Sequence, residues 1–256
     1  MRLVVLGSGS SVPHAKRTSS AYWIESETSK ILIDCAPSAI CRMPQENLKW
    51  FEIDSIWISH FHLDHVGGLA PLLFSLKYSP ETQSRKKPLR IFGPYGLTRL
   101  IKNFDSVNNY RLFEQVFSLE IHEIESLQEF QIADDLVAVA LKTPHTEESL
   151  AISIRDRIGR RVVFTSDTGY DIKLADFARR AELFILECSF VESKPVQTHL
   201  QLSEAIHLVR RAEPKQAMLT HFYPEWDAVV FQEQVERLSP GCEVVEAKDG
   251  LILQVL

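Results

Sequence analysis

The sequence predicts an α+β protein folded as a four-layer αββα sandwich, in which two mixed β-sheets pack face to face and helices cover their outer sides. One observation is that short apolar runs interleave with amphipathic stretches, and a second is that several strand-like runs follow one another in each half of the chain. A third is that 45% hydrophobic and 24% charged residues among 256 are ordinary values for a globular protein. No linker rich in Pro, Gly or Ser divides the chain, so we expect a single domain over residues 1–256.

The first half of the chain combines strands with two helical stretches. Runs rich in Val, Ile and Leu that are bounded by polar turn residues predict strands. A stretch from about Val66 to Tyr78 and another at Gly96–Phe104 have the spacing of helices. The polar stretch Ser79–Lys87 between them predicts an exposed loop. The predicted strands are Leu3–Leu6, Ala21–Ile24, Ile31–Ile33, Ser55–Ser59 and Leu89–Phe92.

The second half begins with strands over residues 119–154 and ends with alternating strands and helices. A hairpin is expected from Leu150–Ile154 and Val162–Thr165, with its turn at Asp156–Arg160. Ser203 is the expected N-cap of a helix that ends at Ala212, and Asp249-Gly250 is a hairpin turn signal between the last two strands. The remaining predictions are helices near Ile172–Arg179 and at Ala228–Leu238, and strands at Ala138–Leu141, Leu183–Glu187, Ala217–Thr220, Val244–Glu246 and Leu251–Leu256.

Charge and cysteine content limit the classes of function. A net charge of −6 argues against wholesale electrostatic binding of nucleic acid. The four cysteines form no Cys-x-x-Cys pair, which is typical of reduced thiols in a cytosolic protein. Residues 1–7 predict a first strand rather than a signal peptide, and no apolar run approaches the roughly 20 residues of a membrane span. We therefore expect a soluble, cytoplasmic protein without a membrane partner.

Four potential metal ligands lie within six residues, directly after the apolar strand that ends at Ser59: His60, His62, Asp64 and His65. In a turn at a strand end, His60 and His62 can point the same way, whereas Asp64 and His65 can turn toward a second position nearby. Imidazoles with a carboxylate suit Zn²⁺, and Mn²⁺ or Fe²⁺ are alternatives. A cluster this dense at ligand spacing favours a metal site over surface histidines.

This His-x-His-x-Asp-His pattern resembles the metallo-β-lactamase superfamily. Three later residues, His145, Asp167 and His221, each follow an apolar run and fit the later ligands of that family. The resemblance implies the αββα fold and a centre of two divalent metal ions. It implies that His60, His62 and His145 hold one ion, that Asp64, His65 and His221 hold the other, and that Asp167 bridges them.

Further segments resemble the ribonuclease Z branch of that superfamily, over nearly the whole chain. They are the opening loop Leu6–Ser10, the second-strand segment Ile31–Cys35, the Ile91–Leu97 segment, Leu219–Phe222 and the closing Ala247–Gly250. The branch implies a phosphodiesterase in which a hydroxide that bridges the metal ions attacks phosphorus.

The resemblance also implies three catalytic residues: Asp64, His199 and Glu187. His199 precedes a helix, and Glu187 ends the strand Leu183–Glu187. In the family a histidine at this place helps to protonate the leaving oxygen, and the glutamate orients it. The chemistry agrees, because an alkoxide leaving group needs a proton and an imidazole near neutral pH can supply one.

One departure from the ribonuclease Z pattern bears on the substrate. The tRNA-processing members carry a long arm that grips tRNA between the third histidine and the bridging aspartate, whereas only 21 residues separate His145 from Asp167. Binding a long polyanion requires several phosphate contacts. We therefore expect a small phosphodiester or another ester to be favoured over RNA.

Several alternatives stay open from sequence. The site could serve a tRNA 3′-processing endoribonuclease, or a hydrolase of carboxylic esters, thioesters, lactones or sulfate esters. A redox protein is less favoured, because diiron relatives tend to replace the second histidine with a carboxylate and residue 62 is His. A binding or scaffold protein is disfavoured, since such members generally lose ligands.

Three further features of the sequence carry expectations without a firm role. His14 lies in the opening loop and could line the pocket. The loop Ser79–Lys87, with its Arg85-Lys86-Lys87 run, could roof a narrow pocket. The apolar helix around Leu69–Leu76 is similar to a segment that the ribonuclease Z branch uses for dimerisation, which implies a homodimer.

Overall fold

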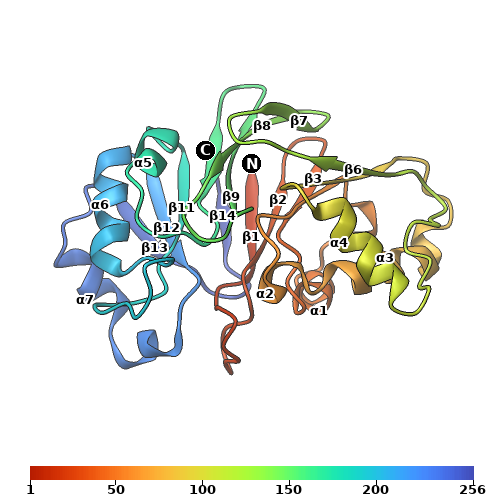
Figure 1. The fold of residues 1–256 in the computed structure, drawn as a ribbon. Coiled ribbons are helices and arrows are strands. Elements are labelled where there is room, and N and C mark those ends of the chain that lie inside the picture. The colour runs from red at the N-terminus through yellow and green to blue at the C-terminus, as the bar shows by residue number, and fades with distance from the viewer.

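The computed structural model describes all residues 1–256 and contains the predicted four-layer sandwich (Figure 1). Two seven-stranded sheets form the middle layers, and helices lie on both sides. The first sheet consists, in spatial order, of β14 (Ile252–Gln254), β1 (Arg2–Gly7), β2 (Ala21–Glu25), β3 (Lys30–Ile33), β4 (Ser55–Trp57), β5 (Leu89–Gly93) and β6 (Leu119–Glu123). The second consists of β13 (Glu243–Glu246), β12 (Gln216–Thr220), β11 (Leu183–Glu187), β10 (Arg161–Phe164), β9 (Leu150–Asp156), β8 (Leu136–Lys142) and β7 (Glu129–Ala133).

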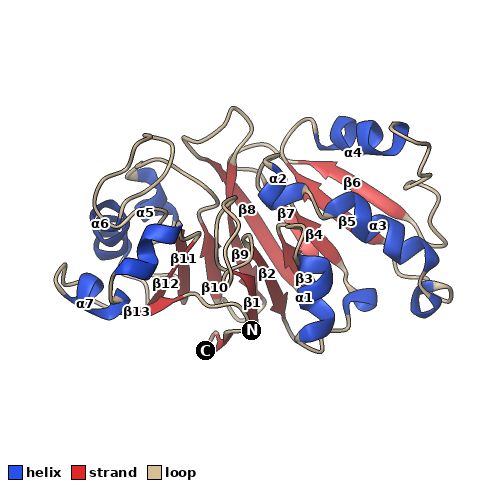
Figure 2. Cartoon of the chain, turned by 90° about the horizontal axis from the view of Figure 1, so that it is seen from below, coloured by secondary structure: helices blue, strands red, loops and turns tan.

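The helices divide between the two outer layers (Figures 1 and 2). Those of the first half of the chain lie against the first sheet and those of the second half against the other. None of the helices combines the length and the apolar character that crossing a lipid bilayer requires. The helices are α1 (Ala39–Gln45), α2 (Leu63–Val66), α3 (Leu69–Tyr78), α4 (Leu97–Ser106), α5 (Lys173–Phe177), α6 (Leu202–Ala212) and α7 (Phe231–Glu236).

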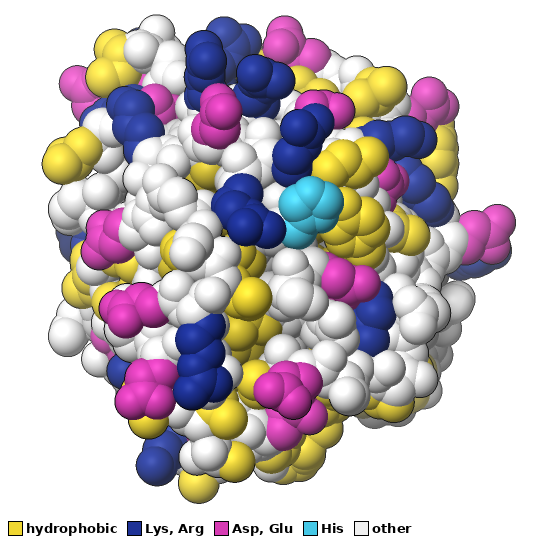
Figure 3. All heavy atoms as spheres, turned by 90° about the vertical axis from the view of Figure 1, so that its left-hand side faces the viewer, with side chains coloured by type: hydrophobic (Ala, Val, Ile, Leu, Met, Phe, Trp, Pro, Cys, Tyr) yellow, Lys and Arg dark blue, Asp and Glu magenta, His cyan; other side chains and the backbone are white.

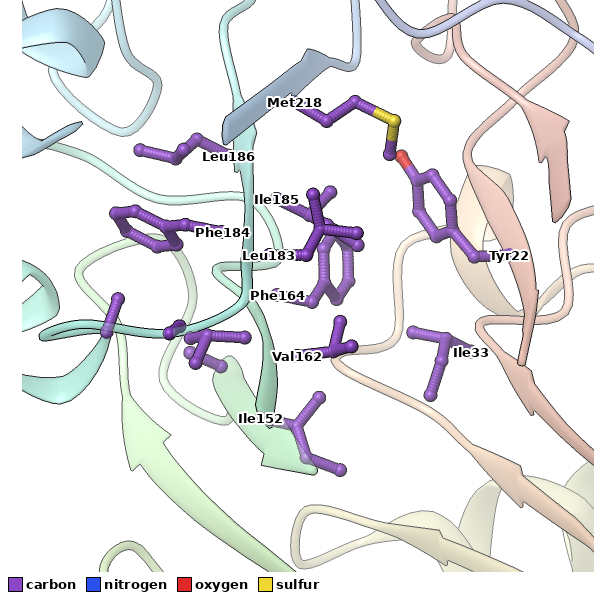
Figure 4. Close-up of a cluster of buried hydrophobic side chains, with 14 of the residues drawn as sticks. Tyr22, Ile33, Ile152, Val162, Phe164, Leu183, Phe184, Ile185, Leu186 and Met218 are labelled. Atoms are coloured by element: carbon purple, nitrogen blue, oxygen red, sulfur yellow. The ribbon is translucent and has the colours of Figure 1, made fainter. Parts of the chain in front are cut away.

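The inner strands of the first sheet are largely apolar on both faces because both faces are covered. In β1, Leu3 and Val5 belong to the core shared with the second sheet, whereas Val4 and Leu6 pack with the helices. Figure 4 shows the shared core, where Tyr22 faces residues of the second sheet. This explains why the strands read as short continuous apolar runs rather than as alternating ones.

Parallel pairing positions the loops that carry polar residues. Strands β3, β4 and β5 are parallel neighbours, and so are β10, β11, β12 and β13. The carboxyl ends of parallel strands meet at the same edge of a sheet, which is where ligands bind in open sheets of this kind. The turns after β3, β4, β10, β11 and β12 therefore gather at one end of the sandwich.

The predicted hairpin at Asp249-Gly250 is wrong. Strand β13 pairs with β12 in the second sheet, whereas β14 pairs with β1 in the first, so the segment between them crosses from one sheet to the other. The carboxylate of Asp249 accepts hydrogen bonds from the backbone and hydroxyl groups of Ser8 and Thr18, at 2.8–2.9 Å. These bonds hold the crossing segment against the first sheet.

Helix boundaries also differ from the predictions. The stretch from Val66 to Tyr78 is divided into α2 and α3 at Gly67-Gly68, because the N–H of Gly68 donates to the carbonyl oxygen of Cys35 at 2.8 Å rather than within a helix. This close approach requires a glycine, since a Cβ on Gly68 would lie 2.3 Å from the carbonyl oxygen of Ala36. The predicted N-cap of α6 at Ser203 is wrong. Gln201 caps the helix in a capping box with Glu204, which satisfies orphan N–H groups reciprocally. The last predicted helix is shorter, since α7 covers only Phe231–Glu236.

The predicted hairpin over residues 150–165 is confirmed. Strands β9 and β10 pair in antiparallel register from Arg155 and Arg161 to Ile152 and Phe164, and a short turn joins them. The segment between His145 and Asp167 is thus a compact part of the second sheet.

Candidate metal centre and active site

All seven residues predicted as metal ligands lie at the end of the sandwich where α2 lies, which is the lower end in Figure 1. These residues lie in segments that follow strands, and the strands concerned end at this edge of the sandwich. His60 and His62 follow β4, Asp64 and His65 belong to α2, His145 follows β8, Asp167 follows β10, and His221 follows β12.

Four of these residues form a first group of donors. The donor atoms of His60, His62, His145 and Asp167 all lie within 4.8 Å of one another. His145 Nε2 is 3.1 Å from His62 Nδ1 and 3.7 Å from Asp167 Oδ2. His60 Nε2 is 3.9 Å from the same carboxylate oxygen. Three imidazoles and one carboxylate oxygen thus converge on one position.

A second group of donors shares Asp167 with the first. The donor atoms of Asp64, His65, Asp167 and His221 also lie within 4.8 Å of one another. The Nε2 atoms of His65 and His221 are 3.3 Å and 3.2 Å from the two oxygens of Asp167. Asp64 Oδ2 is 3.6 Å from each of these imidazole nitrogens. Asp167 is therefore placed to serve two adjacent ions.

The donor chemistry fits divalent metal ions. The Nε2 atoms of His60, His65 and His221 are buried and have no hydrogen-bond partner in the protein. An unsatisfied buried polar atom costs about 1–3 kcal/mol, and these three face carboxylate oxygens rather than solvent. A cation between the imidazoles and the carboxylates satisfies both, and this set of ligands suits Zn²⁺ and similar divalent ions.

Two of the histidines are held from behind by groups that were not predicted from the sequence. Asp34 accepts a hydrogen bond from Nδ1 of His65 at 2.7 Å and one from the Ser59 hydroxyl at 2.8 Å. The Ser59 hydroxyl in turn lies 3.1 Å from Nδ1 of His60. Such contacts fix ring orientation and leave Nε2 free for a metal ion. The position of Asp34 after a strand, like that of the ligands, is the signal that could have identified it.

Glu187 and His199 form a hydrogen-bonded pair beside the donors. Nδ1 of His199 lies 2.8 Å from Glu187 Oε1, and Glu187 is fully buried. The ring of His199 is centred 4.8 Å from the ring of His145 and 5.4 Å from that of His221. Both residues predicted as catalytic besides Asp64 therefore border the donor cluster.

The charges of the cluster shift several pKa values. Burial lowers the pKa of His60 well below 6.5, and the neighbouring histidines lower it further. The negative charge of Asp167 raises this pKa but does not outweigh the other effects. Burial also opposes the charged forms of His65 and Asp167, but their mutual attraction outweighs it. The pKa of His65, which lies between Asp167 and Asp34, is therefore well above 6.5, and that of Asp167 is well below 3.8. A metal ion at Nε2 of His65 would take the place of the proton there.

The pKa of His199 is raised to about 9. Burial acts against the charged imidazolium, but the negative charge of Glu187 and the hydrogen bond to it outweigh this effect. The protonated form is the one present at neutral pH, as a proton donor requires.

Three residues of the site have backbone conformations that side chains rarely adopt. Asp34, Ser166 and His221 have φ values of 58°, 59° and 60°. A non-glycine residue in this left-handed region costs of order 1–3 kcal/mol, and such residues cluster at functional sites. The surrounding hydrogen bonds maintain these conformations.

The expectation that the Ser79–Lys87 loop roofs a pocket at the site is wrong, whereas the expectation that His14 lines the pocket stays a prediction. His14 Nε2 lies 2.6 Å from Oδ2 of Asp227. The Ser79–Lys87 segment is anchored by Arg85, which donates to the carbonyl oxygen of Ile53 at 2.7 Å. Ile53 precedes β4, so this segment lies at the opposite end of that strand from His60 and does not roof the site.

Two cavities flank the donor cluster. One, of about 950 Å³, is lined by His145 and Thr198 together with Lys142 and Lys173. The other, of about 530 Å³, contains Phe61 and reaches Tyr95 and Arg99. Both have volumes in the range of small-molecule sites.

Comparison with known proteins places the chain among metal-dependent hydrolases. The profile of a family described as "Anti-Pycsar protein Apyc1" matches residues 1–238. Ribonuclease Z of Clostridium acetobutylicum is 26% identical over 279 aligned positions, which cover 87% of this chain and 88% of that protein.

Solved structures show the same fold. Human tRNase Z, short form, superposes with a TM-score of 0.82 at 22% identity and covers 100% of both chains. The metallo-β-lactamase fold protein YhfI from Bacillus subtilis has a TM-score of 0.80 at 22% identity and covers 98% of both chains. These two likenesses show that the sandwich is the metallo-β-lactamase fold.

Proposed function

We propose that this chain, which belongs to the Anti-Pycsar protein Apyc1 family, cleaves small phosphodiesters with two bound Zn²⁺ ions. The chain is a metal-dependent hydrolase of phosphoester bonds with the metallo-β-lactamase fold. The observation that carries this proposal is the His199–Glu187 pair, hydrogen-bonded at 2.8 Å, beside seven converging metal donors. A proton donor next to a cation site suits an ester whose leaving group is an alcohol.

The seven donors divide into two sites in this proposal. His60, His62 and His145 hold one ion, and Asp64, His65 and His221 hold the other, with Asp167 shared; the two donor groups with Asp167 in common support this division. When bound, the cations supply Lewis-acid stabilisation of the charge that builds on the phosphoryl oxygens and lower the pKa of water.

The protein's own groups act on the leaving oxygen. Glu187 accepts the Nδ1 proton of His199, which leaves Nε2 to hold the proton that the departing alkoxide takes. The raised pKa of His199, about 9, keeps this proton in place at pH 7. Glu187 itself is held by backbone N–H groups of Thr168 and Leu200, at 2.8 and 3.1 Å. The pair is thus oriented before substrate arrives.

Several features support a small substrate rather than a long RNA. Only a short hairpin, β9 and β10, occupies the segment between His145 and Asp167. The cavities beside the donors measure about 530 and 950 Å³, sizes that suit a ligand of drug-like dimensions. On the face that Figure 3 shows, where α5–α7 lie, basic and acidic side chains are interspersed rather than gathered into a basic stripe.

The proposal includes one domain and a second copy of the chain. Met1 and Val255 belong to the same core cluster, which supports a single domain over residues 1–256. Phe74, Tyr78 and Tyr110 form a contacting aromatic group and are 44%, 60% and 40% exposed. An exposed aromatic group of this kind is typical of protein interfaces, so it supports a homodimer through α3.

A substrate panel tests the proposal. Protein stripped with a chelator and reloaded with Zn²⁺ or Mn²⁺ is assayed on bis(p-nitrophenyl) phosphate, a dinucleotide, a p-nitrophenyl carboxylic ester, a p-nitrophenyl sulfate and a precursor tRNA. We expect metal-dependent cleavage of both diesters, absence of cleavage after chelation, and loss in His62→Ala. The His207→Ala variant, altered at an exposed histidine stacked on Tyr170, serves as the matched control.

A different ranking of the substrates would redirect the proposal. The ribonuclease Z of Clostridium acetobutylicum favours a tRNA 3′-processing endoribonuclease as the second candidate. If the precursor tRNA is cleaved with a far higher kcat/KM than the dinucleotide, that second function replaces the first. If only the carboxylic or sulfate ester is turned over, the phosphodiester proposal is wrong.

A further inference from the structure

A buried carboxylate in each half of the molecule holds two histidines, one directly and one through a serine. In the first half, Asp34 holds Nδ1 of His65 at 2.7 Å and, through the Ser59 hydroxyl, Nδ1 of His60. Asp34 and Ser59 are both fully buried. Both histidines held in this way are among the proposed metal ligands.

The second half repeats this arrangement with a different outcome. Glu187 holds Nδ1 of His199 directly at 2.8 Å and the Ser189 hydroxyl at 2.8 Å. The Ser189 hydroxyl lies 3.0 Å from Nδ1 of His221. Here the histidine held directly is the proton donor, whereas the one held through serine is a proposed metal ligand. Ser189, which is fully buried, therefore joins the two parts of the site.

Proton accounting fixes the direction of these hydrogen bonds. The Ser189 hydroxyl has one proton and two lone pairs. Both oxygens of Glu187 already accept backbone N–H groups, so the carboxylate acts as the acceptor and the hydroxyl donates to it. Its lone pairs then face Nδ1 of His221, which must carry the proton. In the neutral imidazole Nε2 of His221 is then bare, and this is the buried atom without a partner in the protein that lies 3.2 Å from Asp167.

We propose that Ser189 is a positioning residue that sets the tautomer of His221 for metal binding and couples this ligand to the His199–Glu187 pair. The proposal rests on the proposed function for the role of His199, but its statement about His221 concerns the protein alone. Without the hydroxyl, Nδ1 of His221 has no acceptor and either ring nitrogen can carry the proton. The fraction of the protein with Nε2 free then falls, and Glu187 loses one of the donors that hold it.

The parallel serine provides a comparison variant. Ser59→Ala removes the same kind of link on the other side, but Asp34 contacts no proton donor for the leaving group. We therefore expect Ser59→Ala to weaken metal binding only, and Ser189→Ala to weaken metal binding and leaving-group protonation together. Ser20→Ala is the structural control, because the buried Ser20 hydroxyl donates to a backbone carbonyl, Gly9 O, at 3.0 Å.

The first readout is made on metal-free protein. Long-range ¹⁵N–¹H spectra of histidine at pH 8, with His221→Asn for assignment, report which nitrogen carries the proton. We expect the Nδ1–H form in the wild type and a mixture or the Nε2–H form in Ser189→Ala. Zn²⁺ titration should show a 10–100-fold lower affinity in Ser189→Ala, the range seen when groups behind a ligand are removed. Ser189→Thr, which keeps the hydroxyl, should recover part of it.

The second readout separates the role of Ser189 in catalysis from its role in metal binding. At saturating Zn²⁺, the ratio of kcat on the dinucleotide to kcat on bis(p-nitrophenyl) phosphate should fall in Ser189→Ala and stay near the wild-type value in Ser59→Ala. Nitrophenolate leaves without a proton, so only the dinucleotide depends on His199.

The outcomes distinguish the two proposals. A Ser189→Ala protein that keeps the Nδ1–H form of His221 and binds Zn²⁺ within twofold of the wild type overturns the inference. If that variant does not fold, as judged by circular dichroism, Ser189→Cys replaces the hydroxyl by a weakly hydrogen-bonding thiol without leaving a cavity, and the same two measurements are made on it. A wild type that cleaves no diester contradicts the proposed function, whereas the tautomer and affinity results still decide the role of Ser189.

Discussion

Five histidines of the site differ in the group that their Nδ1 atom contacts. They are His60, His65, His145, His199 and His221. A backbone carbonyl, that of Thr198, lies 2.9 Å from Nδ1 of His145. Carboxylates hold the rings of His65 and His199, and serine hydroxyls hold those of His60 and His221. The partner of Nδ1 fixes the orientation of each ring. What Nε2 faces then separates the two rings that carboxylates hold, because Nε2 of His65 lies 3.3 Å from Asp167 among the donors whereas His199 stands beside them.

A first prediction concerns His199. His199→Ala should lower kcat on a dinucleotide by about 10²–10⁴-fold, the usual worth of general acid catalysis, and should lower kcat on bis(p-nitrophenyl) phosphate far less. Metal content, measured by mass spectrometry of the digested protein, should equal that of the wild type, because the ring stands beside the donors and not among the seven. An equal loss on both substrates would remove His199 from the role of proton donor.

At this scale the sequence predicted which residues meet but not how they are held. The ligand pattern is local for His60, His62, Asp64 and His65, and the resemblance to the metallo-β-lactamase superfamily implies the three distant ligands, so the sequence contains the information for all seven. The supporting contacts of Asp34, Ser59 and Ser189 depend on distances between strands from different parts of the chain. No spacing rule contains those distances.

At the scale of elements, apolar runs predicted where most strands lie. They did not predict the ends of the helices or which strands pair with β13 and β14. Strands from β1 to β5 and from β9 to β12 lie within a residue or two of their predicted ranges. The Asp249-Gly250 turn looked like a hairpin because its sequence is a strong local signal. Four hydrogen bonds from Ser8 and Thr18 to Asp249 outweigh that signal and take the chain across to the other sheet.

A second prediction concerns the segment after α3. The guanidinium of Arg85 donates to the carbonyl oxygens of Phe51, Ile53 and Pro88 and lies 4.8 Å from the centre of the Phe117 ring. Arg85→Ala should lower the free energy of unfolding by about 1.5–3 kcal/mol, as loss of hydrogen bonds to a charged group does. Because the segment is remote from the donors, kcat of the folded protein should not change.

The control for Arg85 is its exposed neighbour. Lys86→Ala should change the free energy of unfolding, measured by urea denaturation, by less than about 0.5 kcal/mol. Equal effects of the two substitutions, or a loss of kcat in Arg85→Ala at full metal loading, would contradict the structural role assigned to this arginine.

At the scale of the whole molecule, the two sheets are tied together at their rims as well as through their core. The buried carboxylate of Asp135, between β7 and β8 of the second sheet, accepts hydrogen bonds from Ser26 at 2.9 Å and Thr28 at 3.3 Å, in the turn between β2 and β3 of the first. Burial alone would raise the pKa of Asp135, but the hydrogen bonds from the Ser26–Ser29 turn outweigh it and the pKa is lowered from 3.8.

This shift gives a third prediction, on stability and pH. A carboxyl group whose pKa is lower in the folded state stabilises the fold above its ordinary pKa, and the contribution is lost as the pH falls through the folded-state value. Asp135→Asn should therefore be less stable than the wild type at pH 7, by about 1–2 kcal/mol, and the difference should shrink below pH 3.8. Urea unfolding at pH 7 and near pH 3 measures it. A difference that is independent of pH would contradict this role.

The fold class was predictable because sandwich layers follow from the order of apolar and amphipathic runs, whereas the pairing of the two sheets was not. The core that joins Met1 to Val255 depends on contacts across the full length of the chain. The same holds for the substrate, since the cavity beside His145 is lined by segments as far apart in the sequence as Ser126 and Thr198.

The central claim is that two metal ions on the seven donors make this chain a phosphodiesterase, and its most direct test is a titration of metal-free protein with Zn²⁺ in which bound metal and dinucleotide hydrolysis are followed together. We predict that hydrolysis is absent without metal, rises with occupancy, and reaches its maximum at two ions per chain, with Asp167→Ala binding fewer ions and showing no hydrolysis. Saturation at one ion per chain, or two bound ions without hydrolysis, would contradict the account.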